Sequence, residues 1–450
     1  MSHFPSARCY WVAYSGGIDS EVLLNAMAEL RPRLKAEVRA VHLDHGLQTD
    51  SPAWASHCRR SCARLGVMLT VQRLELTPEP GKSLEALARD ARYGALSAII
   101  GDGDLVLTGQ HRDDQAETLL LALLRGSGPK GLSAMPAVAP LGGGHLARPL
   151  LGFGRADLRA YARARRLAWI EDSSNADLVF DRNFLRRRVL PLLTERWPAC
   201  SEALARSAAH CAEAQGLIDR LSKQTLGEIA GRRPGTLSIS GLRGCDRALA
   251  KAALRHWVRG LGLPTPNLKH VHRILDEILA ARADATPMVA WSGCEVRSFR
   301  DDLFAMAPLP PPPGQRALHW SKGPLELPQG IGRLALKHSD GRIADPTELS
   351  PSGLAVRFGV TGANCRPRPR MQRRALKKLF QEGAVPAWLR PYVPFVFTGD
   401  TLVAVGDLCT CFSTPRAEGR QFRIIWYGGV RHHPAFATSG IENRATNDRL

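Results

Sequence analysis

The sequence predicts an α/β protein whose first part is a parallel sheet with helices on both faces. A mainly helical middle domain and a small mixed α+β C-terminal domain should follow. This division depends on three observations. Residues 1–200 alternate short apolar runs with helix-like stretches, as in βαβ units. Residues 201–307 carry apolar side chains at three- and four-residue spacing. A proline-rich linker at 308–318 then separates residues 319–450.

The first part should alternate strands and helices. Brief runs rich in β-branched or apolar residues predict strands at Cys9–Tyr14, Val38–Leu43, Val67–Leu74 and Leu105–Leu107. The spacing of apolar residues predicts helices at Glu21–Leu30, Pro52–Leu65, Ser83–Ile100 and Asp113–Arg125. Ligands of such sheets bind beyond the carboxyl ends of the strands, so the residues that follow each strand are the candidates for chemistry.

The two later parts have weaker patterns. The same reasoning predicts helices at Ser201–Leu221, Cys245–Leu261 and Leu268–Ala283, followed by short strands at Met288–Trp291 and Glu295–Phe299. Beyond the linker we expect strands at Gly332–Leu336, Ala355–Phe358, Phe395–Phe397 and Thr401–Val405 around one basic helix, Arg373–Lys378.

Charge and composition limit the class of protein. The 450 residues carry 61 Lys and Arg against 42 Asp and Glu, a net charge of +19. This excess predicts a polyanionic partner such as RNA, although an arginine-rich proteome would also produce it. No apolar run reaches the ~20 residues that span a membrane. Ten cysteines, mostly single, and the lack of an export signal favour reduced thiols and a cytoplasmic location.

The most informative motif is the loop Ser15-Gly16-Gly17-Ile18-Asp19-Ser20, between the first predicted strand and helix. Paired glycines at such a turn let backbone N–H groups and a helix N-terminus approach a pyrophosphate. The hydroxyls of Ser15 and Ser20 add donors, and Asp19 is placed to meet the Mg²⁺ that accompanies a nucleotide. An ordinary βα turn would use similar residues.

Carboxylates and histidines follow two other strands. Asp44 closes the second strand between two histidines and is a candidate to hold metal or accept a proton, although Asp-His-Gly also suits a turn. His111 and Asp114 follow the strand Leu105–Leu107, and Asp114 shares a helix face with Glu117. Clustered carboxylates suit Mg²⁺, but acidic residues also favour any first helical turn.

Two arginine pairs are candidate anion ligands. Arg89 and Arg92 lie three residues apart on one predicted helix, where they would clamp a phosphate or remain solvated beside acidic neighbours. Arg182 and Arg186 lie one helical turn apart, a spacing that suits a phosphate or a flipped base better than a core.

These motifs together resemble the tRNA(Ile)-lysidine synthetase family of the PP-loop ATP pyrophosphatase superfamily. The resemblance depends on the order of the motifs, on the glycine-rich segment Arg125–Met135 and on the Trp169–Arg186 pattern, and it covers nearly the whole chain. It implies an adenine nucleotide alpha hydrolase-like fold for the first domain. It also implies that ATP adenylates O2 of the wobble cytidine of a CAU-anticodon isoleucine tRNA, and that free L-lysine then attacks C2 and expels AMP.

The resemblance extends to the basic segment near the C-terminus. Arg373, Arg374, Lys377 and Lys378, with Trp388 and Arg390, offer phosphate contacts and a stacking surface for tRNA. The family usually has a Gly-Gly pair before the Leu-Lys-Lys run, where this chain has Met371-Gln372-Arg373-Arg374.

Rival functions remain open at this point. A PP-loop tRNA thiolase would need paired cysteines, and the chain has no Cys-x-x-Cys. A ligase of small metabolites fits the high positive charge poorly, and a silent tRNA-binding protein would not need an intact loop. The sequence leaves the oligomeric state open, a homodimer included.

Overall fold

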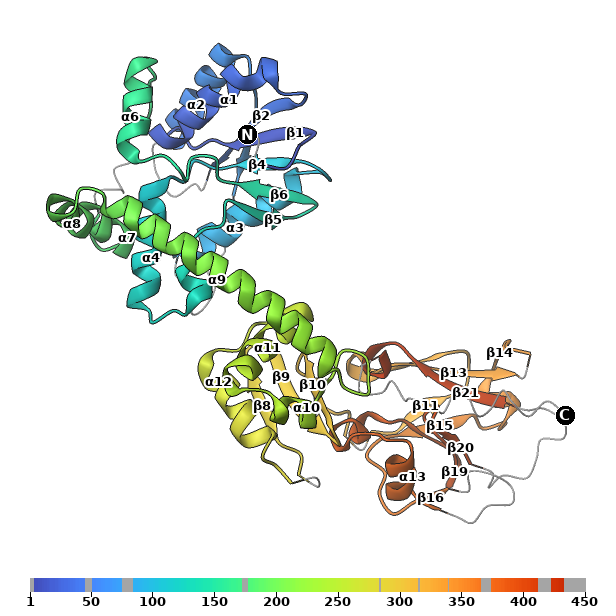
Figure 1. Cartoon of the computed structure of the whole chain (residues 1–450). Helices are drawn as coiled ribbons and strands as arrows, with labels where there is room; N and C mark the ends of the chain where they lie inside the picture. The colour runs from blue at the N-terminus through green and yellow to red at the C-terminus, as the bar shows by residue number, and fades with distance from the viewer. Residues whose placement is uncertain are drawn as a thin grey trace. The chain divides into compact units, whose positions relative to one another are not determined.

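A computed structural model describes residues 4–44, 51–74, 84–171, 177–282, 285–314, 316–338, 340–365, 374–411 and 422–432 (Figure 1). The chain folds into two compact units, Met1–Leu217 and Ile218–Leu450. No helix in the described ranges is long and apolar enough to cross a membrane. The finer division at residues 200, 308 and 318 remains a prediction.

The first unit is built on a six-stranded sheet in the order β3-β2-β1-β4-β6-β5. Only β5 is antiparallel to its neighbour. The strands are β1 (Cys9–Ala13), β2 (Glu37–Asp44), β3 (Met68–Arg73), β4 (Leu105–Leu107), β5 (Val138–Leu141) and β6 (Gly144–Ala147). The parallel sheet and its first four strands are therefore confirmed, whereas the sequence did not predict the β5–β6 hairpin.

Helices cover both faces of this sheet, as expected. Tyr10 and Val12 of β1 pack with α1, α2 and α6, whereas Cys9 and Trp11 pack with α3, since successive side chains of a strand alternate between faces. The helices are α1 (Ile18–Leu30), α2 (Ser51–Leu65), α3 (Leu84–Ile99), α4 (Arg112–Leu124), α5 (Pro129–Leu132), α6 (Arg155–Ala164), α7 (Asp181–Phe184), α8 (Leu190–Arg196) and α9 (Cys200–Glu228). A 3-10 turn η1 (Arg31–Arg33) follows α1, and a π-helical turn η3 (Leu185–Val189) joins α7 to α8.

The second unit begins with a four-stranded sheet in the order β7-β10-β9-β8, covered by helices. The strands are β7 (Leu237–Ser238), β8 (Met288–Trp291), β9 (Cys294–Phe299) and β10 (Asp302–Met306), and the helices are α10 (Ile239–Gly244), α11 (Arg247–Gly260), α12 (Leu268–Arg273) and the π-helical turn η4 (Ile274–Ile278). The sequence missed β10 because the β9–β10 turn lacks the usual glycine signal, and Arg300 instead adopts φ +56°.

Two larger sheets and one two-stranded sheet make up the rest of the second unit. One larger sheet has the order β11-β15-β18-β19-β20, and in the other β12, β14 and β21 each pair with β13. Their strands are β11 (Leu318–Trp320), β12 (Leu325–Leu327), β13 (Gly332–His338), β14 (Ile343–Ala344), β15 (Leu354–Arg357), β18 (Phe395–Thr398), β19 (Thr401–Val405), β20 (Cys409–Thr410) and β21 (Phe422–Tyr427). Short pieces complete it: β16 (Asn364–Cys365), β17 (Arg374–Ala375), α13 (Leu376–Glu382), η5 (Pro328–Gly330), η6 (Pro346–Glu348), η7 (Ala387–Tyr392) and η8 (Gly429–His432).

Two expectations need correction here, one about the basic helix and one about the cysteines. The basic helix begins at Leu376, because Arg374 belongs to strand β17, and Arg373 lies outside the described residues. The side chains on the two sides of the proline-rich run share one core, in which the ring of Phe304 packs 5.8 Å from that of Trp388. The cysteines are not all reduced, because Cys365 and Cys411 are joined in a disulfide across 46 residues.

Candidate active site

The loop at the carboxyl end of β1 has the shape of an anion cradle. Gly16 adopts φ +85°, and a Cβ there would lie 3.3 Å from both Cys58 Sγ and Ile170 Cδ1, so only glycine fits. The hydroxyl groups of Ser15 and Ser20 lie 3.1 Å apart, and the Ser20 hydroxyl donates to the Gly17 carbonyl at 2.9 Å. Gly17 caps α1 without any side-chain hydrogen bond, which leaves the helix N-terminus to a ligand.

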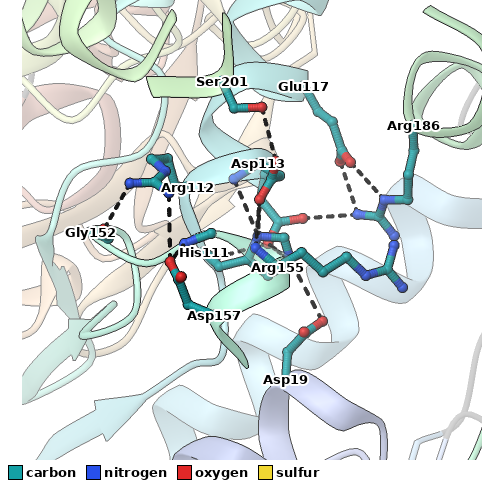
Figure 2. Close-up of polar contacts among 12 residues, drawn as sticks. Asp19, His111, Arg112, Asp113, Glu117, Gly152, Arg155, Asp157, Arg186 and Ser201 are labelled. Atoms are coloured by element: carbon teal, nitrogen blue, oxygen red, sulfur yellow. Dashed lines mark hydrogen bonds and ion pairs between the residues drawn. The ribbon is translucent and has the colours of Figure 1, made fainter. Parts of the chain in front are cut away.

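Asp19 lies in the first turn of α1, beside this loop. Its Oδ2 lies 3.7 Å from His111 Nε2, and its Oδ1 is buried without a hydrogen-bond partner (Figure 2). Burial raises the pKa of Asp19, against the lowering effect of the nearby His111 and Arg155 charges. A buried carboxylate oxygen without a partner is costly by itself, so this atom fits a site that a cation completes.

His111 fixes the geometry on the opposite side of Asp19. It is the N-cap of α4: its Nδ1 accepts a hydrogen bond from Asp113 N at 3.2 Å, and its own backbone N donates to Asp114 Oδ2 at 2.9 Å. Since Nδ1 accepts, a neutral ring carries its proton on Nε2, which lies 3.5 Å from Asp114 Oδ2 and faces Asp19 as well. Asp19, His111 and Asp114 therefore lie together.

The carboxylate of Asp113 has a different role. Its Oδ2 accepts from Arg155 N at 2.7 Å, and its Oδ1 accepts from Ser201 Oγ at 2.9 Å (Figure 2). Burial alone would raise the pKa of Asp113, but these hydrogen bonds lower it below its ordinary value. Asp113 therefore joins α4 to the starts of α6 and α9 rather than holding a metal.

Arg182 and Arg186 are not free anion ligands, which corrects the expectation from their spacing. Arg186 grips the fully buried Glu117 with two hydrogen bonds, Nε at 2.6 Å and Nη2 at 3.0 Å, and also donates to Asp114 Oδ1 at 2.9 Å. Arg182 donates to Thr118 Oγ1 at 2.9 Å and lies 3.4 Å from Glu117 Oε2. A buried carboxylate needs such partners, so both arginines hold α4 and Asp114 in place.

The remaining predicted residues of the first unit are less closely tied to the loop. Asp44 is the last residue of β2, which pairs directly with β1. It therefore lies at the carboxyl end of the parallel strands, as expected. Arg89 and Arg92 are exposed on α3, and Arg89 lies 5.5 Å over the ring of Tyr93. The segment Asp172–Asn175 of the Trp169–Arg186 pattern lies outside the described residues.

Two residues near the loop were missed from sequence. Gly109, which follows β4, lies so near α1 that a Cβ would come within 3.0 Å of Asp19 C and 3.1 Å of Ser20 N. Arg155 begins α6, and its buried Nε has no hydrogen-bond partner. Figure 2 shows its side chain among Asp19, His111 and Arg186. A single Gly or Arg carries no signal in a sequence, since only the packing of α1, β4 and α6 brings them to the loop.

The basic segment of the second unit has both exposed and buried members. Lys377 and Lys378 are exposed on α13, whereas Arg374 pairs with Glu382. Trp388 is buried between Phe299 and Phe304, with Arg297 5.6 Å over its ring, so it cannot serve as the expected stacking surface for RNA. Arg390 is half-buried over Phe380.

The fold and loop geometry define a class of protein, the PP-loop ATP pyrophosphatases, which use ATP. A family model for the PP-loop domain matches residues 2–193. A model for a TilS substrate binding domain matches residues 237–304, and a model for a TilS substrate C-terminal domain matches residues 354–426. The tRNA(Ile)-lysidine synthase of Methylococcus capsulatus is 43% identical over 88% of this chain and 91% of its own. That of Vibrio cholerae is 40% identical over 92% and 93%. The chain belongs to the tRNA(Ile)-lysidine synthase family.

A solved structure, the U34-tRNA thiolase NcsA from Methanococcus maripaludis, covers 47% of this chain and 74% of its own. Its TM-score of 0.40 and identity of 13% are too low to bear on function. The cysteines near the loop also do not suit a thiolase, because burial raises the pKa of Cys58 and of Cys62 to about 12.

Proposed function

We propose that this protein ligates L-lysine to C2 of the wobble cytidine in a CAU-anticodon isoleucine tRNA, with release of AMP and pyrophosphate. The observation that carries the proposal is the loop Ser15–Ser20 with Asp19 facing His111 and Asp114, in a chain whose relatives are tRNA(Ile)-lysidine synthases along nearly their whole length. Since tRNA is its substrate, the enzyme is expected to act in the cytoplasm.

The loop and the start of α1 would bind the phosphates of ATP. Backbone N–H groups at the helix N-terminus and the hydroxyls of Ser15 and Ser20 donate to phosphate oxygens, and the unpartnered Nε of Arg155 adds a positive charge. Asp19 and Asp114 would hold Mg²⁺, which neutralises charge on the leaving pyrophosphate. The unpartnered Oδ1 of Asp19 supports this role, because protein sites give Mg²⁺ one or two carboxylates.

The second step, in which lysine attacks the cytidine, needs a neutral lysine amine and a cytosine already activated by adenylation. The lysine amine must lose a proton before or as it attacks C2, and Asp44 at the carboxyl end of β2 is the proposed acceptor of that proton. Arg89 and Arg92, exposed on α3, are proposed to contact a phosphate of ATP or of the tRNA. Arg182 and Arg186 act through Glu117 and Asp114 as positioning residues.

The second unit would bind the body of the tRNA. Lys377 and Arg390 line a groove of about 520 Å³ beside α13, together with Gly359, Gly362, Phe380 and Pro391. Two cationic side chains at a groove with an apolar floor suit a phosphate–sugar backbone. Lys378, exposed on the same helix, would extend this surface, and the net charge of +19 favours the encounter with a polyanion.

One assay tests the function directly. The full chain is incubated with ATP, radiolabelled lysine and either the CAU isoleucine tRNA or the same tRNA with a changed wobble base. We expect label at an internal nucleotide of the CAU tRNA alone, stable to the mild base that strips aminoacyl esters. ATP–pyrophosphate exchange that ignores both tRNA and lysine would instead indicate a ligase of small metabolites.

A further inference from the structure

Three cysteines of the second unit gather at one point. Cys365 lies in β16, Cys409 in β20 and Cys411 one residue beyond β20. Their three sulfur atoms lie within 4.8 Å of one another, and Cys365 Sγ is 3.4 Å from Cys409 Sγ. Within the described ranges this is the only group of three or more metal-ligand side chains so close together.

A disulfide between Cys365 and Cys411 leaves the third sulfur unexplained. Cys365 and Cys411 are 0% and 2% exposed, and Cys409 closes the cluster from a half-buried position. In a tetrahedral zinc site with Zn–S bonds of about 2.3 Å, the sulfur atoms lie roughly 3.8 Å apart. The Cys365 Sγ–Cys409 Sγ distance of 3.4 Å is close to that value. Cys365 and Cys411 are bonded to each other, so an ion can enter only after this disulfide is reduced and its two sulfurs separate.

In a reducing compartment, cellular thiols would reduce the Cys365–Cys411 disulfide of this structure to two thiols, which then become available to an ion. This step depends on the proposed function, because an enzyme that modifies tRNA works where thiols are kept reduced. Cysteine thiolates are ligands that Zn²⁺ and other thiophilic metals prefer. The Cys-Thr-Cys spacing also places Cys409 and Cys411 on the same side of their strand, since side chains two residues apart share a face.

The cluster is placed to order the proposed tRNA-binding helix. Cys365 pairs in register with Arg374 of β17, and α13 begins two residues later at Leu376. β20, in turn, is the edge strand of the five-stranded sheet. An ion held by the three cysteines would therefore fasten the β16–β17 pair, and with it the start of α13, to that sheet edge.

We propose that the reduced cluster of Cys365, Cys409 and Cys411 binds a thiophilic divalent cation, with Zn²⁺ as the ion expected. The three thiols give up their protons to solvent as they become ligands, and the fourth tetrahedral position goes to water or one further ligand. The role is structural, because the three thiolates belong to the second unit, whereas the PP-loop and Asp19 belong to the first.

The test uses the full chain, purified with a reductant and dialysed against metal-free buffer after loading with Zn²⁺. Zinc is counted by elemental mass spectrometry, and Co²⁺ in its place reports tetrahedral thiolate ligands by its visible and ultraviolet bands. We expect about one zinc per chain, with thiolate-to-cobalt absorption. Cys409→Ser should lose both signals, whereas the control Cys211→Ser, a half-buried thiol outside the cluster, should keep them.

The disulfide alternative predicts different results. Cys409→Ser would then leave the Cys365–Cys411 bond and the metal content unchanged, and peptide mapping of protein alkylated in intact cells would recover that bond without zinc. Either result overturns the proposal, as does wild-type protein without retained zinc. Because the readout is metal content, a failure of lysidine formation would not be mistaken for a failure of the metal site.

Discussion

Asp19 is the side chain on which the proposed chemistry of the first unit depends most. It faces His111, stands near Asp114 and keeps one buried oxygen without a protein partner. Replacing Asp19 with Asn keeps its shape and removes its charge. We expect tRNA-dependent pyrophosphate release to fall by about 10²-fold or more, because electrostatic stabilisation of the leaving group is lost.

Binding of tRNA to Asp19→Asn, measured by filter retention, should stay within about twofold, since the phosphate contacts remain elsewhere. Glu29→Gln on the same helix, at an exposed position paired with Arg165, is the matched control and should behave as wild type. Equal losses of activity and of tRNA affinity in Asp19→Asn would mean that Asp19 supports the structure rather than the reaction.

Cys58 and Cys62 lie on α2 beside the loop and are both buried. Because burial raises the pKa of each thiol to about 12, we expect almost no alkylation by iodoacetamide at about pH 8 in the folded protein. The half-buried Cys211 should react first. Mass spectrometry of timed samples measures this order, and fast labelling of Cys58 would contradict it.

The same shift links the two thiols to stability. The pKa of each thiol in the folded protein lies above its ordinary value of 9.0, so the folded state holds these protons more tightly than the unfolded state. Their stabilising effect is therefore complete below about pH 9 and declines as the pH rises from 9 towards 12. Urea unfolding midpoints of wild type and Cys58→Ala should converge over that window.

At the scale of elements, the Glu117–Arg186 pair fastens α4 to the turn η3. Glu117→Gln takes from the half-buried Arg186 the carboxylate that accepts two of its hydrogen bonds and leaves its hydrogen bond to Asp114. We expect a loss of about 3 kcal/mol in the free energy of unfolding, because breaking a buried pair from one side leaves an uncompensated charge. Denaturation followed by circular dichroism measures it.

A double-mutant cycle with Arg186→Met separates a positioning role from simple anion binding. If Arg186 acts through Glu117, the double mutant should lose less free energy of unfolding than the sum of the two single losses. Additive losses in stability, with tRNA affinity lost only in Arg186→Met, would return Arg186 to the role of an RNA ligand.

Helix α13 carries the second prediction at this scale. Lys377→Glu with Lys378→Glu should weaken tRNA binding at least about tenfold and lower the salt slope by roughly two phosphate contacts. ATP–pyrophosphate exchange should be unchanged, since the loop lies in the other unit. Lys322→Glu, an exposed lysine of the second unit outside α13, is the control, and equal effects from it would indicate only a general charge effect.

For the whole molecule, the net charge of +19 predicts an affinity for tRNA dominated by counterion release. Raising KCl from about 50 to about 200 mM should weaken tRNA binding by about 10³-fold, as expected for six or more phosphate contacts. In a plot of the logarithm of the binding constant against the logarithm of the KCl concentration, the cognate tRNA and a tRNA without the CAU anticodon should have the same slope and different intercepts. A flat salt response would show that the basic surface does not contact the RNA backbone.

Sequence alone determined the parts of the protein whose signals are local. The short apolar runs and the helical spacing of apolar residues predicted β1–β4 and α1–α4, and the motif Ser15–Ser20 predicted the anion cradle. Both kinds of signal depend only on residues that are close together in the sequence. Tertiary structure decided which polar groups remain available. In the folded chain Arg186 donates to Glu117, Ser201 donates to Asp113, and Trp388 is buried against Phe299. Tertiary structure also brought Gly109 and Arg155 to the loop and three cysteines together, since contacts between distant segments leave no periodic trace in the chain.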